Sequence, residues 1–370
     1  MKVAILHSWF LIPGGSEKVV DVLAGMYLEA DIYALFLDPA KLSPALRNHR
    51  VIPTLLNRIP FATTKLHRHL MPLYPWAVES LDLREYDLVI SSCGPAMMGA
   101  SIREDASHIS YCHSPQRSWW DLYPEHQRQL KGVSRHMFTF GATWVRTWEF
   151  AGMQRVDHVI ANSNYIAARV QKYFRRESTV IYPPVAVNTQ PASPAGGEYY
   201  LTLGRLEKPK RIDLLIHACN SLGRRLLIAG TGKEDAYLKS LAGPTIEFLG
   251  FVADSKLPDL YAGARAFLFA SLEDFGIAPV EAQSYGIPVI AYGRGGSLET
   301  VRVNDPEGRP DTGIFFFEQT AYSLIEAILR FEEKEQKFYR SEIQRHANQF
   351  GTARFVENFS NFVRANVTRT

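Results

Sequence analysis

Two glutamates in the last third of the chain, Glu273 and Glu281, have a spacing and a setting that suggest chemistry. The apolar run 267–270 predicts a buried strand that stops shortly before Glu273, and Pro279 suits the first turn of a helix that carries Glu281. The first N–H groups of such a helix have no partner within it, so both carboxylates would lie beside a natural anion site. In a parallel sheet, ligands bind at this edge of the strands.

A pair of glutamates alone is weak evidence, because the chain has 38 acidic residues. The full setting, Ser-x-Glu-Asp-Phe-Gly-Ile-x-Pro-x-Glu-Ala, resembles the Glu-x7-Glu motif of the retaining glycosyltransferases of family GT4. By that resemblance Glu273 would hold the donor sugar near its reacting face, and Glu281 would accept hydrogen bonds from the ribose hydroxyls. The backbone around Phe275, Gly276 and Ile277 would meet the donor diphosphate. The plain alternative is a strand–loop–helix with surface carboxylates.

A cationic loop follows the expected strand 200–203. Arg205 and Lys210 stand just outside this strand, where arginine can form bidentate contacts with a diphosphate and lysine acts as a point charge. The spacing Gly-Arg-Leu-x-x-x-Lys is similar to the donor-phosphate loop of the family, which implies that both cations contact the diphosphate. The sequence departs from the family at Arg211, where many members have glycine, so the loop is expected to be altered. A solvated basic turn is the alternative.

Two further segments are implied in donor binding. Gly14 and Gly15 stand between an expected strand and helix, where glycines let a backbone approach a ligand closely. They form neither the G-x-G-x-x-G fingerprint nor a P-loop, and a simple turn is the alternative. The family resemblance places them against the donor phosphates. The strand expected near 246–252 would lie under the nucleotide base, with Phe251 and Val252 at its end.

The segment from His113 to Asp121, His-Ser-Pro-Gln-Arg-Ser-Trp-Trp-Asp, follows another expected strand. It resembles the His-x-Pro-x-Arg-x-x-Trp-Asp signature of a GT4 branch rich in mannosyltransferases that build polysaccharide and O-antigen repeats. The resemblance implies that His113 contacts the donor sugar and that Arg117, Trp119, Trp120 and Asp121 lie near the acceptor cleft. A histidine at a strand end is more often structural, and core packing is the alternative for one of the tryptophans. The branch favours GDP-mannose as donor, with a UDP-hexose as the alternative.

Residues 41–78 combine basic and apolar side chains and contain no acidic residue. Such a mixture suits an anionic membrane surface or the diphosphate of a lipid carrier, and it predicts peripheral contact with a membrane. The alternative, of equal weight, is a solvated loop and helix whose apolar side packs on its own domain.

Strands alternate with helices in both halves of the 370 residues, which predicts an α/β protein. The resemblance implies the GT-B architecture, in which two doubly wound Rossmann-like domains face each other across a cleft. We expect an acceptor-side domain at 1–187, a nucleotide-sugar-binding domain at 188–350, and a C-terminal helix at 351–370 that crosses back to the first domain.

The composition excludes several classes of protein. Three cysteines cannot form a paired disulfide framework, which fits a reducing cytosol. No run of apolar residues is long enough to span a bilayer, and the start of the chain does not read as a signal peptide. A net charge of +3 and the lack of any recognition motif argue against nucleic acid. The expected location is therefore cytoplasmic, with possible attachment to the inner face of a membrane.

The predicted reaction is transfer of a sugar from a nucleotide donor to a hydroxyl of a glycan or a lipid-linked glycan, with retention. No Asp-x-Asp occurs, so we expect no metal and no cofactor. Three other functions stay open. A glycoside hydrolase also uses two carboxylates but has no need of the cationic loop. A sugar-nucleotide epimerase would not need the segment from His113 to Asp121. A non-catalytic nucleotide-binding protein would bind the donor without turning it over.

Overall fold

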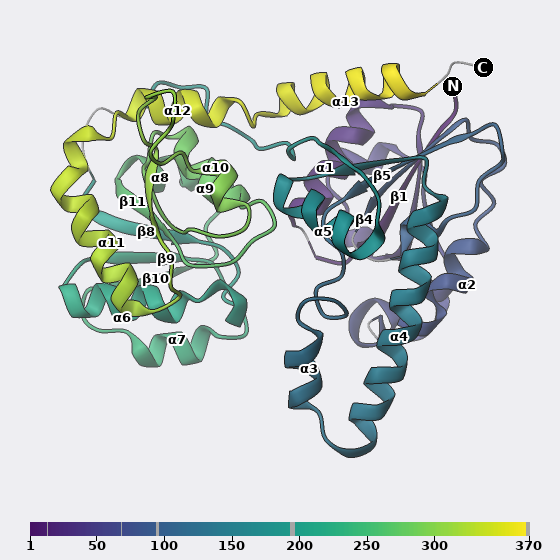
Figure 1. The fold of residues 1–370 in the computed structure, drawn as a ribbon, viewed down its shortest axis with the longest axis horizontal. Coiled ribbons are helices and arrows are strands. Elements are labelled where there is room, and N and C mark those ends of the chain that lie inside the picture. The colour runs from purple at the N-terminus through teal and green to yellow at the C-terminus, as the bar shows by residue number, and fades with distance from the viewer. Residues whose placement is uncertain (13, 68, 94–95, 193–196, 368–370) are drawn as a thin grey trace. The chain divides into compact units, whose positions relative to one another are not determined.

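The computed structural model describes residues 1–12, 14–67, 69–93, 96–192 and 197–367. The chain divides into two compact units (Figure 1). Unit 1 contains Met1–Pro184 and Phe355–Thr370, and unit 2 contains Val185–Arg354. Each unit is a parallel sheet with helices packed against it.

Unit 1 contains a seven-stranded sheet in the order β3-β2-β1-β4-β5-β6-β7. Its strands are β1 (Val3–Phe10), β2 (Asp31–Leu37), β3 (Val51–Pro53), β4 (Leu88–Cys93), β5 (Ser107–Cys112), β6 (His158–Ala161) and β7 (Thr179–Val180). Its helices are α1 (Gly15–Met26), α2 (Tyr74–Glu79), α3 (Tyr123–Gln129), α4 (Gly132–Arg155), α5 (Asn164–Phe174) and α13 (Thr352–Asn366), the last of which starts in unit 2.

The two faces of this sheet carry two separate apolar cores. Successive side chains of β1 point to opposite faces, so Leu6 packs in one core and Ile5 in the other. Both faces are covered, as expected for a parallel sheet. The core that contains Ile5 also contains Phe355 and Phe359 of α13, so the last helix of the chain is part of unit 1.

Unit 2 contains a six-stranded sheet in the order β10-β9-β8-β11-β12-β13. Its strands are β8 (Tyr199–Leu203), β9 (Leu226–Ala229), β10 (Ile246–Gly250), β11 (Ala264–Phe269), β12 (Val289–Tyr292) and β13 (Gly313–Phe316). Its helices are α6 (Ile212–Leu222), α7 (Asp235–Leu241), α8 (Leu257–Ala262), α9 (Ile277–Ser284), α10 (Ser297–Thr300), α11 (Ala321–Lys334) and α12 (Arg340–Asn348).

The local sequence patterns predict most of these elements. Ser163 caps α5, because its hydroxyl accepts a hydrogen bond of 3.1 Å from the N–H of Ile166. The helix α8 ends at Ala262, and Ala264 already begins β11. The strand β13 is not predicted by the sequence analysis.

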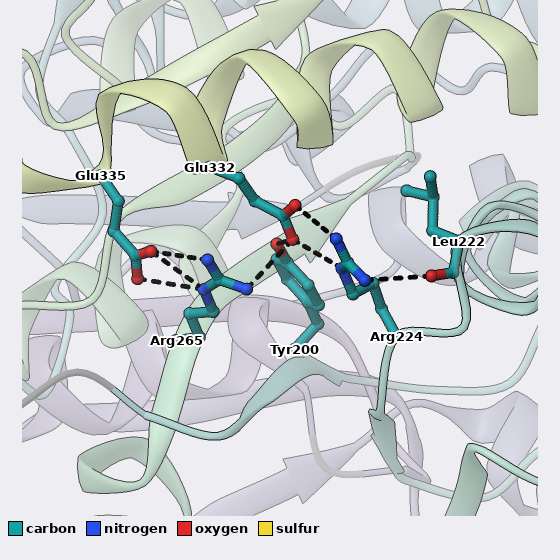
Figure 2. Close-up of polar contacts among 6 residues, drawn as sticks. All are labelled: Tyr200, Leu222, Arg224, Arg265, Glu332 and Glu335. Carbon is teal, nitrogen blue, oxygen red and sulfur yellow. Dashed lines mark hydrogen bonds and ion pairs between the residues drawn. The ribbon is translucent and has the colours of Figure 1, made fainter.

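A carboxylate on α11 joins three elements at the edge of the unit 2 sheet where β8 and β11 begin. Figure 2 shows Glu332 between two arginines: its carboxylate accepts hydrogen bonds from the Arg224 guanidinium at 2.8 Å and from Arg265 Nη1 at 3.0 Å. The hydroxyl of Tyr200 donates a further bond of 2.8 Å. Hydrogen bonding from Arg224 lowers the pKa of Glu332, against the opposing effect of burial. Glu335 pairs with Arg265 on its other side.

We predict that Glu332→Gln destabilises unit 2 by about 2 kcal/mol, because an amide cannot satisfy both guanidinium groups and the tyrosine hydroxyl. Calorimetric unfolding of the variant should show a lower melting temperature. Glu333→Gln, at the exposed neighbouring position of the same helix, is the control and should melt with the wild type. Equal melting temperatures for both variants would contradict the prediction.

Candidate active site

The central feature of unit 2 is an ion pair at the carboxyl edge of its sheet. Lys210 Nζ lies 2.6 Å from Glu273 Oε1. Lys210 follows β8 and Glu273 follows β11, and these two strands are neighbours at the point where the strand order reverses. Such a reversal opens a crevice at the carboxyl ends of the strands, where ligands of doubly wound folds bind. The structure therefore brings the predicted diphosphate lysine and the predicted sugar carboxylate into contact.

The turn after β12 fixes the loop that carries Glu273. The N–H of Gly296 donates a hydrogen bond of 2.9 Å to the Glu273 carbonyl. A side chain at position 296 is excluded, because a Cβ there would lie 2.3 Å from the backbone of Phe275. Phe275 is buried and packs edge-on against Phe350, with 5.6 Å between ring centroids. The loop is thus held from two sides by backbone and aromatic contacts.

The helix α9 begins directly after this loop. Gly276, its N-cap, has φ = 92°, in the left-handed region that glycine adopts without strain, and no side chain caps the helix. The first amides of α9, starting at Ile277, are therefore available to an anion. Gln283 anchors the far end of α9 by donating to the carbonyl of Thr300 at 2.8 Å.

Glu281 lies one turn inside α9 and is partly exposed. It lies near a tyrosine pair that the sequence analysis does not predict: Tyr261 and Tyr285 stack with 4.8 Å between centroids. Burial raises the pKa of both hydroxyls, and the negative charge of Glu281 adds to the effect. The carboxylate of Glu281 is therefore placed beside two neutral phenols.

Arg205 and Arg211 occupy the loop after β8. Arg205 is exposed, and among the described residues its guanidinium has no ion-pair or hydrogen-bond partner. Arg211 has φ = 51° and ψ = 39°, so the position keeps the left-handed conformation that favours the glycine of other members. Its side chain pairs with Asp213 at 3.2 Å. The loop therefore keeps its turn, and the change at this position alters the side chain rather than the backbone path.

The predicted base-binding residues follow β10, the edge strand of unit 2. Gly250 ends this strand and accepts a hydrogen bond of 2.7 Å from the N–H of Gly230. Phe251 comes next and is 81% exposed, and Val252 is partly exposed. An aromatic side chain held free of the core at this edge is available to a ligand.

In unit 1, four polar side chains form a chain of contacts at the carboxyl ends of β1, β4 and β5. Glu17 Oε1 lies 3.5 Å from His7 Nε2, and the Nδ1–H of His7 donates to the Ser92 carbonyl at 2.6 Å. The Ser92 hydroxyl bonds His113 Nε2 at 2.9 Å. Gly14, the N-cap of α1, lies over the carboxylate of Glu17, which a Cβ at position 14 would meet at 2.9 Å. His113 and the Gly14-Gly15 turn are therefore linked through His7 and Ser92.

The electrostatics of this chain keep His113 neutral. Burial, helped by His7, lowers the pKa of His113 to about 3. Burial opposes ionisation of Glu17, but contacts with His7 and Ser16 outweigh it and lower the pKa of this carboxyl. Asn162 donates a hydrogen bond of 2.9 Å to the His113 carbonyl. A neutral imidazole with a fixed backbone suits a positioning or hydrogen-bonding role better than that of a cation.

The predicted acceptor segment is held by an arginine from α5. Arg169 Nη2 lies 2.7 Å from Asp121 Oδ1, and Arg117 Nε lies 3.1 Å from Asp121 Oδ2. Arg169 also donates to the Ser114 hydroxyl at 2.9 Å and to the Pro115 carbonyl at 3.1 Å. Because Arg169 is almost fully buried, these bonds fix the path of the whole segment.

The two tryptophans of this segment have different surroundings. Trp120 packs against the core of unit 1, stacks on Tyr173 at 4.8 Å and donates its indole N–H to Glu149 at 2.8 Å. Trp119 stacks on Phe138 of α4 at 5.0 Å. Trp120 therefore has the core-packing environment that the sequence analysis names as the alternative for one tryptophan.

Residues 41–78 divide between core and surface. The stretch forms β3, several short turns and the helix α2, and Arg68 lies outside the described residues. Its apolar side chains range from buried to exposed: Leu46, Leu56, Ala62, Tyr74, Ala77 and Val78 are buried, Leu55, Phe61, Leu73 and Trp76 are exposed, and others are half-buried. Part of the stretch therefore packs on its own domain, and the exposed apolar side chains leave peripheral membrane contact as a prediction.

Several site residues lie outside the sequence prediction. His7, Ser92, Arg169 and Glu149 are distant in the sequence from the residues that they contact. The one signal available for His7 is a polar residue within the apolar strand that precedes Gly14. Within the described ranges, no group of three or more His, Cys, Asp or Glu side chains could hold a metal ion. Of the helices described, none is both long and apolar enough to cross a bilayer.

Comparison with solved structures identifies the class of protein. The Anabaena protein HepE, solved with UDP, aligns over 99% of this chain and 100% of its own with a TM-score of 0.71 and 20% identity. Sucrose-phosphate synthase of Thermosynechococcus elongatus aligns over 99% of both chains with a TM-score of 0.72 and 18% identity. Two parallel-sheet domains with these neighbours define the GT-B fold of glycosyltransferases.

The family follows from the sequence comparisons. Residues 13–189 match Glycosyltransferase Family 4, and residues 188–350 match Glycosyl transferases group 1. The alpha-1,3/1,6-mannosyltransferase ALG2 of Kluyveromyces lactis is 27% identical over 373 aligned residues, which cover 81% of this chain and 71% of that protein. The chain belongs to the GT4-type glycosyltransferases, as its sequence motifs predict.

Glu149 generates a prediction about pH. Burial raises the pKa of Glu149 from 4.5 to about 7, opposed by the bond from Trp120. Between these two pH values the folded protein keeps a proton that the unfolded chain releases, so this carboxyl makes stability fall as pH rises.

As the pH rises from 4.5 to about 7, we therefore expect the free energy of unfolding of Glu149→Gln to increase by about 3 kcal/mol relative to that of the wild type. Urea unfolding at a series of pH values measures the difference. Buried histidines titrate equally in both proteins and cancel in the comparison. Parallel stability curves for the two proteins would show that Glu149 is not protonated in the fold.

Proposed function

We propose that this glycosyltransferase moves a hexose, with mannose from GDP-mannose as the favoured donor, onto a hydroxyl of a glycan or lipid-linked glycan. The sequence signature from His113 to Asp121 and the name of the Kluyveromyces lactis relative support mannose. A UDP-hexose is the second candidate, supported by HepE, which was solved with UDP-glucose.

The observation that carries the proposal is the contact between Lys210 and Glu273. In a nucleotide sugar the transferred sugar is bonded directly to the diphosphate. A diphosphate bound by Lys210 therefore places its sugar within reach of Glu273, which can hold the sugar hydroxyls. A simple nucleotide-binding protein has no need of a carboxylate at the sugar, and the segment from His113 to Asp121 favours transfer over epimerisation.

The proposed reaction breaks the bond between the anomeric carbon and the diphosphate oxygen, and the acceptor oxygen bonds to the same face of that carbon. Charge that develops on the leaving diphosphate is stabilised by Arg205, Lys210 and the first amides of α9. These groups replace the metal ion that other glycosyltransferases use, so no metal or cofactor is needed. The acceptor proton passes to an oxygen of the departing diphosphate.

Unit 1 supplies the remaining groups in this proposal. Neutral His113 orients the donor sugar, and its carbonyl supports developing positive charge on the sugar. Arg117, Trp119 and Asp121 serve the acceptor, while Trp120 supports the segment from the core side. The enzyme acts in the cytoplasm at the inner face of a membrane, where a lipid-linked acceptor would be available.

Nucleotide binding tests the donor directly. We expect GDP and GDP-mannose to raise the melting temperature of the protein in the presence of a chelator, whereas ADP and its conjugates do not. A ligand at a hundred times its dissociation constant adds about 2.7 kcal/mol of stability. A shift with UDP compounds instead would replace mannose by a UDP-hexose. No shift with any nucleotide would overturn the proposed function.

Substitutions of Arg205 and Glu273 test the mechanism. We predict that Arg205→Ala and Glu273→Gln each slow sugar transfer by about 100-fold or more, because each removes a group that faces the reacting bond. Lys208→Ala, at an exposed position of the same loop, is the control and should stay near the wild-type rate. The anomeric proton of the product, observed by NMR, should show retention. Full activity of Glu273→Gln beside an inactive Arg205→Ala would exclude the proposed role of the carboxylate.

A further inference from the structure

The helix α4 carries a stripe of exposed apolar side chains along one face. Val133, Met137, Phe140 and Trp144 follow one another at intervals of four, three and four residues, which is the spacing of a single helix face. They are 75%, 70%, 78% and 49% exposed, respectively. Large apolar side chains are normally exposed singly, whereas a contiguous row of them marks an interaction surface.

The opposite face of α4 packs on the rest of unit 1. Ala142, Val145 and Glu149 are buried there, and Gly152 approaches Gly99 so closely that a Cβ would lie 3.0 Å from its Cα. The apolar stripe is therefore separate from the side of α4 that faces the core. In Figure 1 the α3–α4 hairpin extends away from the sheet of unit 1, and the stripe occupies the part of α4 toward the hairpin tip.

The charge of the hairpin identifies the partner. The residues of the hairpin with fixed positive charge are Arg128, Lys131, Arg135, Arg146 and Arg155. Its acidic residues are Glu125, which is exposed, and Glu149, whose pKa burial raises to about 7. Arg128, Lys131 and Arg135 are exposed around the tip. A row of apolar side chains beside exposed cations matches an anionic phospholipid surface, with Trp144 suited to the headgroup level.

The hairpin is also joined to the predicted acceptor segment. Arg146 of α4 lies over the rings of Trp120 and Tyr123, at 6.0 and 4.9 Å from their centroids. Trp119 stacks on Phe138 of the same helix. The exposed apolar face therefore belongs to a helix that directly contacts the predicted acceptor segment.

We propose that the exposed face of α4, formed by Val133, Met137, Phe140 and Trp144, docks this enzyme on anionic phospholipid bilayers. The inference rests on the proposed function, because it explains how the acceptor segment meets a membrane-borne acceptor. It places the main contact on the α3–α4 hairpin rather than on residues 41–78.

Flotation of the full-length protein with vesicles tests this surface. Vesicles of phosphatidylcholine alone are compared with vesicles that also contain phosphatidylglycerol. The double variant Met137→Glu/Phe140→Glu should bind the anionic vesicles at least about tenfold more weakly than the wild type does, because it places two charges on the inserted face. Leu28→Glu, at a 75% exposed position of unit 1 outside the hairpin, is the control and should bind like the wild type.

Two further measurements separate the possible outcomes. The melting temperature and its shift with nucleotide should be unchanged in the double variant, because the altered side chains lie outside the core and the donor site. Loss of the nucleotide shift in every protein would refute the proposed function, and the flotation result would still be decisive for docking. Equal flotation of wild type and double variant, or no flotation of the wild type, would overturn the docking proposal. A wild-type dimer that the double variant abolishes, without vesicle binding, would assign the face to a second copy of the chain.

Discussion

The reversal of strand order in each parallel sheet is the constraint on which the sites of this protein depend. In each sheet the second and third strands of the chain lie on one side of the first strand, and the fourth and later strands lie on its other side. The loops after the first and fourth strands therefore diverge at the same edge of the sheet. In unit 2 these loops carry Lys210 and Glu273. In unit 1 the first and fourth strands themselves pair His7 with Ser92, and the Ser92 hydroxyl contacts His113 at the end of β5. In doubly wound sheets, ligands bind in the crevice that opens where such loops diverge.

The same topology supports two different electrostatic environments. In unit 2 the ion pair is partly exposed and lies beside the uncapped N-terminus of α9, so the site offers fixed positive potential to an anion. In unit 1 His7 and Ser92 are buried at the corresponding edge, and desolvation lowers the pKa of His113 to about 3. A charged diphosphate suits the first environment, and an uncharged sugar suits the second.

Local sequence patterns were sufficient for the α/β class and for most elements, because strands buried on both faces are short apolar runs and each half alternates them with amphipathic helices. The position of Glu273 at a strand end could be predicted in the same way. Its contact with Lys210 could not be derived from local pattern, since 63 residues separate the two. Arg169 and Glu149 escaped prediction because both are charged residues within helices, where a solvated position is the ordinary expectation. The strand β13 escaped because its four residues follow a long polar loop.

The contribution of α13 to unit 1 has a consequence for synthesis on the ribosome. One of the two cores of unit 1 needs Phe355, Phe359 and Val363, which are translated only after the whole of unit 2. Unit 2 is continuous in the chain, so it is the first unit to possess all its core residues, although it is the second to begin. Until α13 has been translated, the nascent unit 1 must keep the apolar face that receives this helix uncovered. The order of folding is therefore the reverse of the order in which the two units start to emerge.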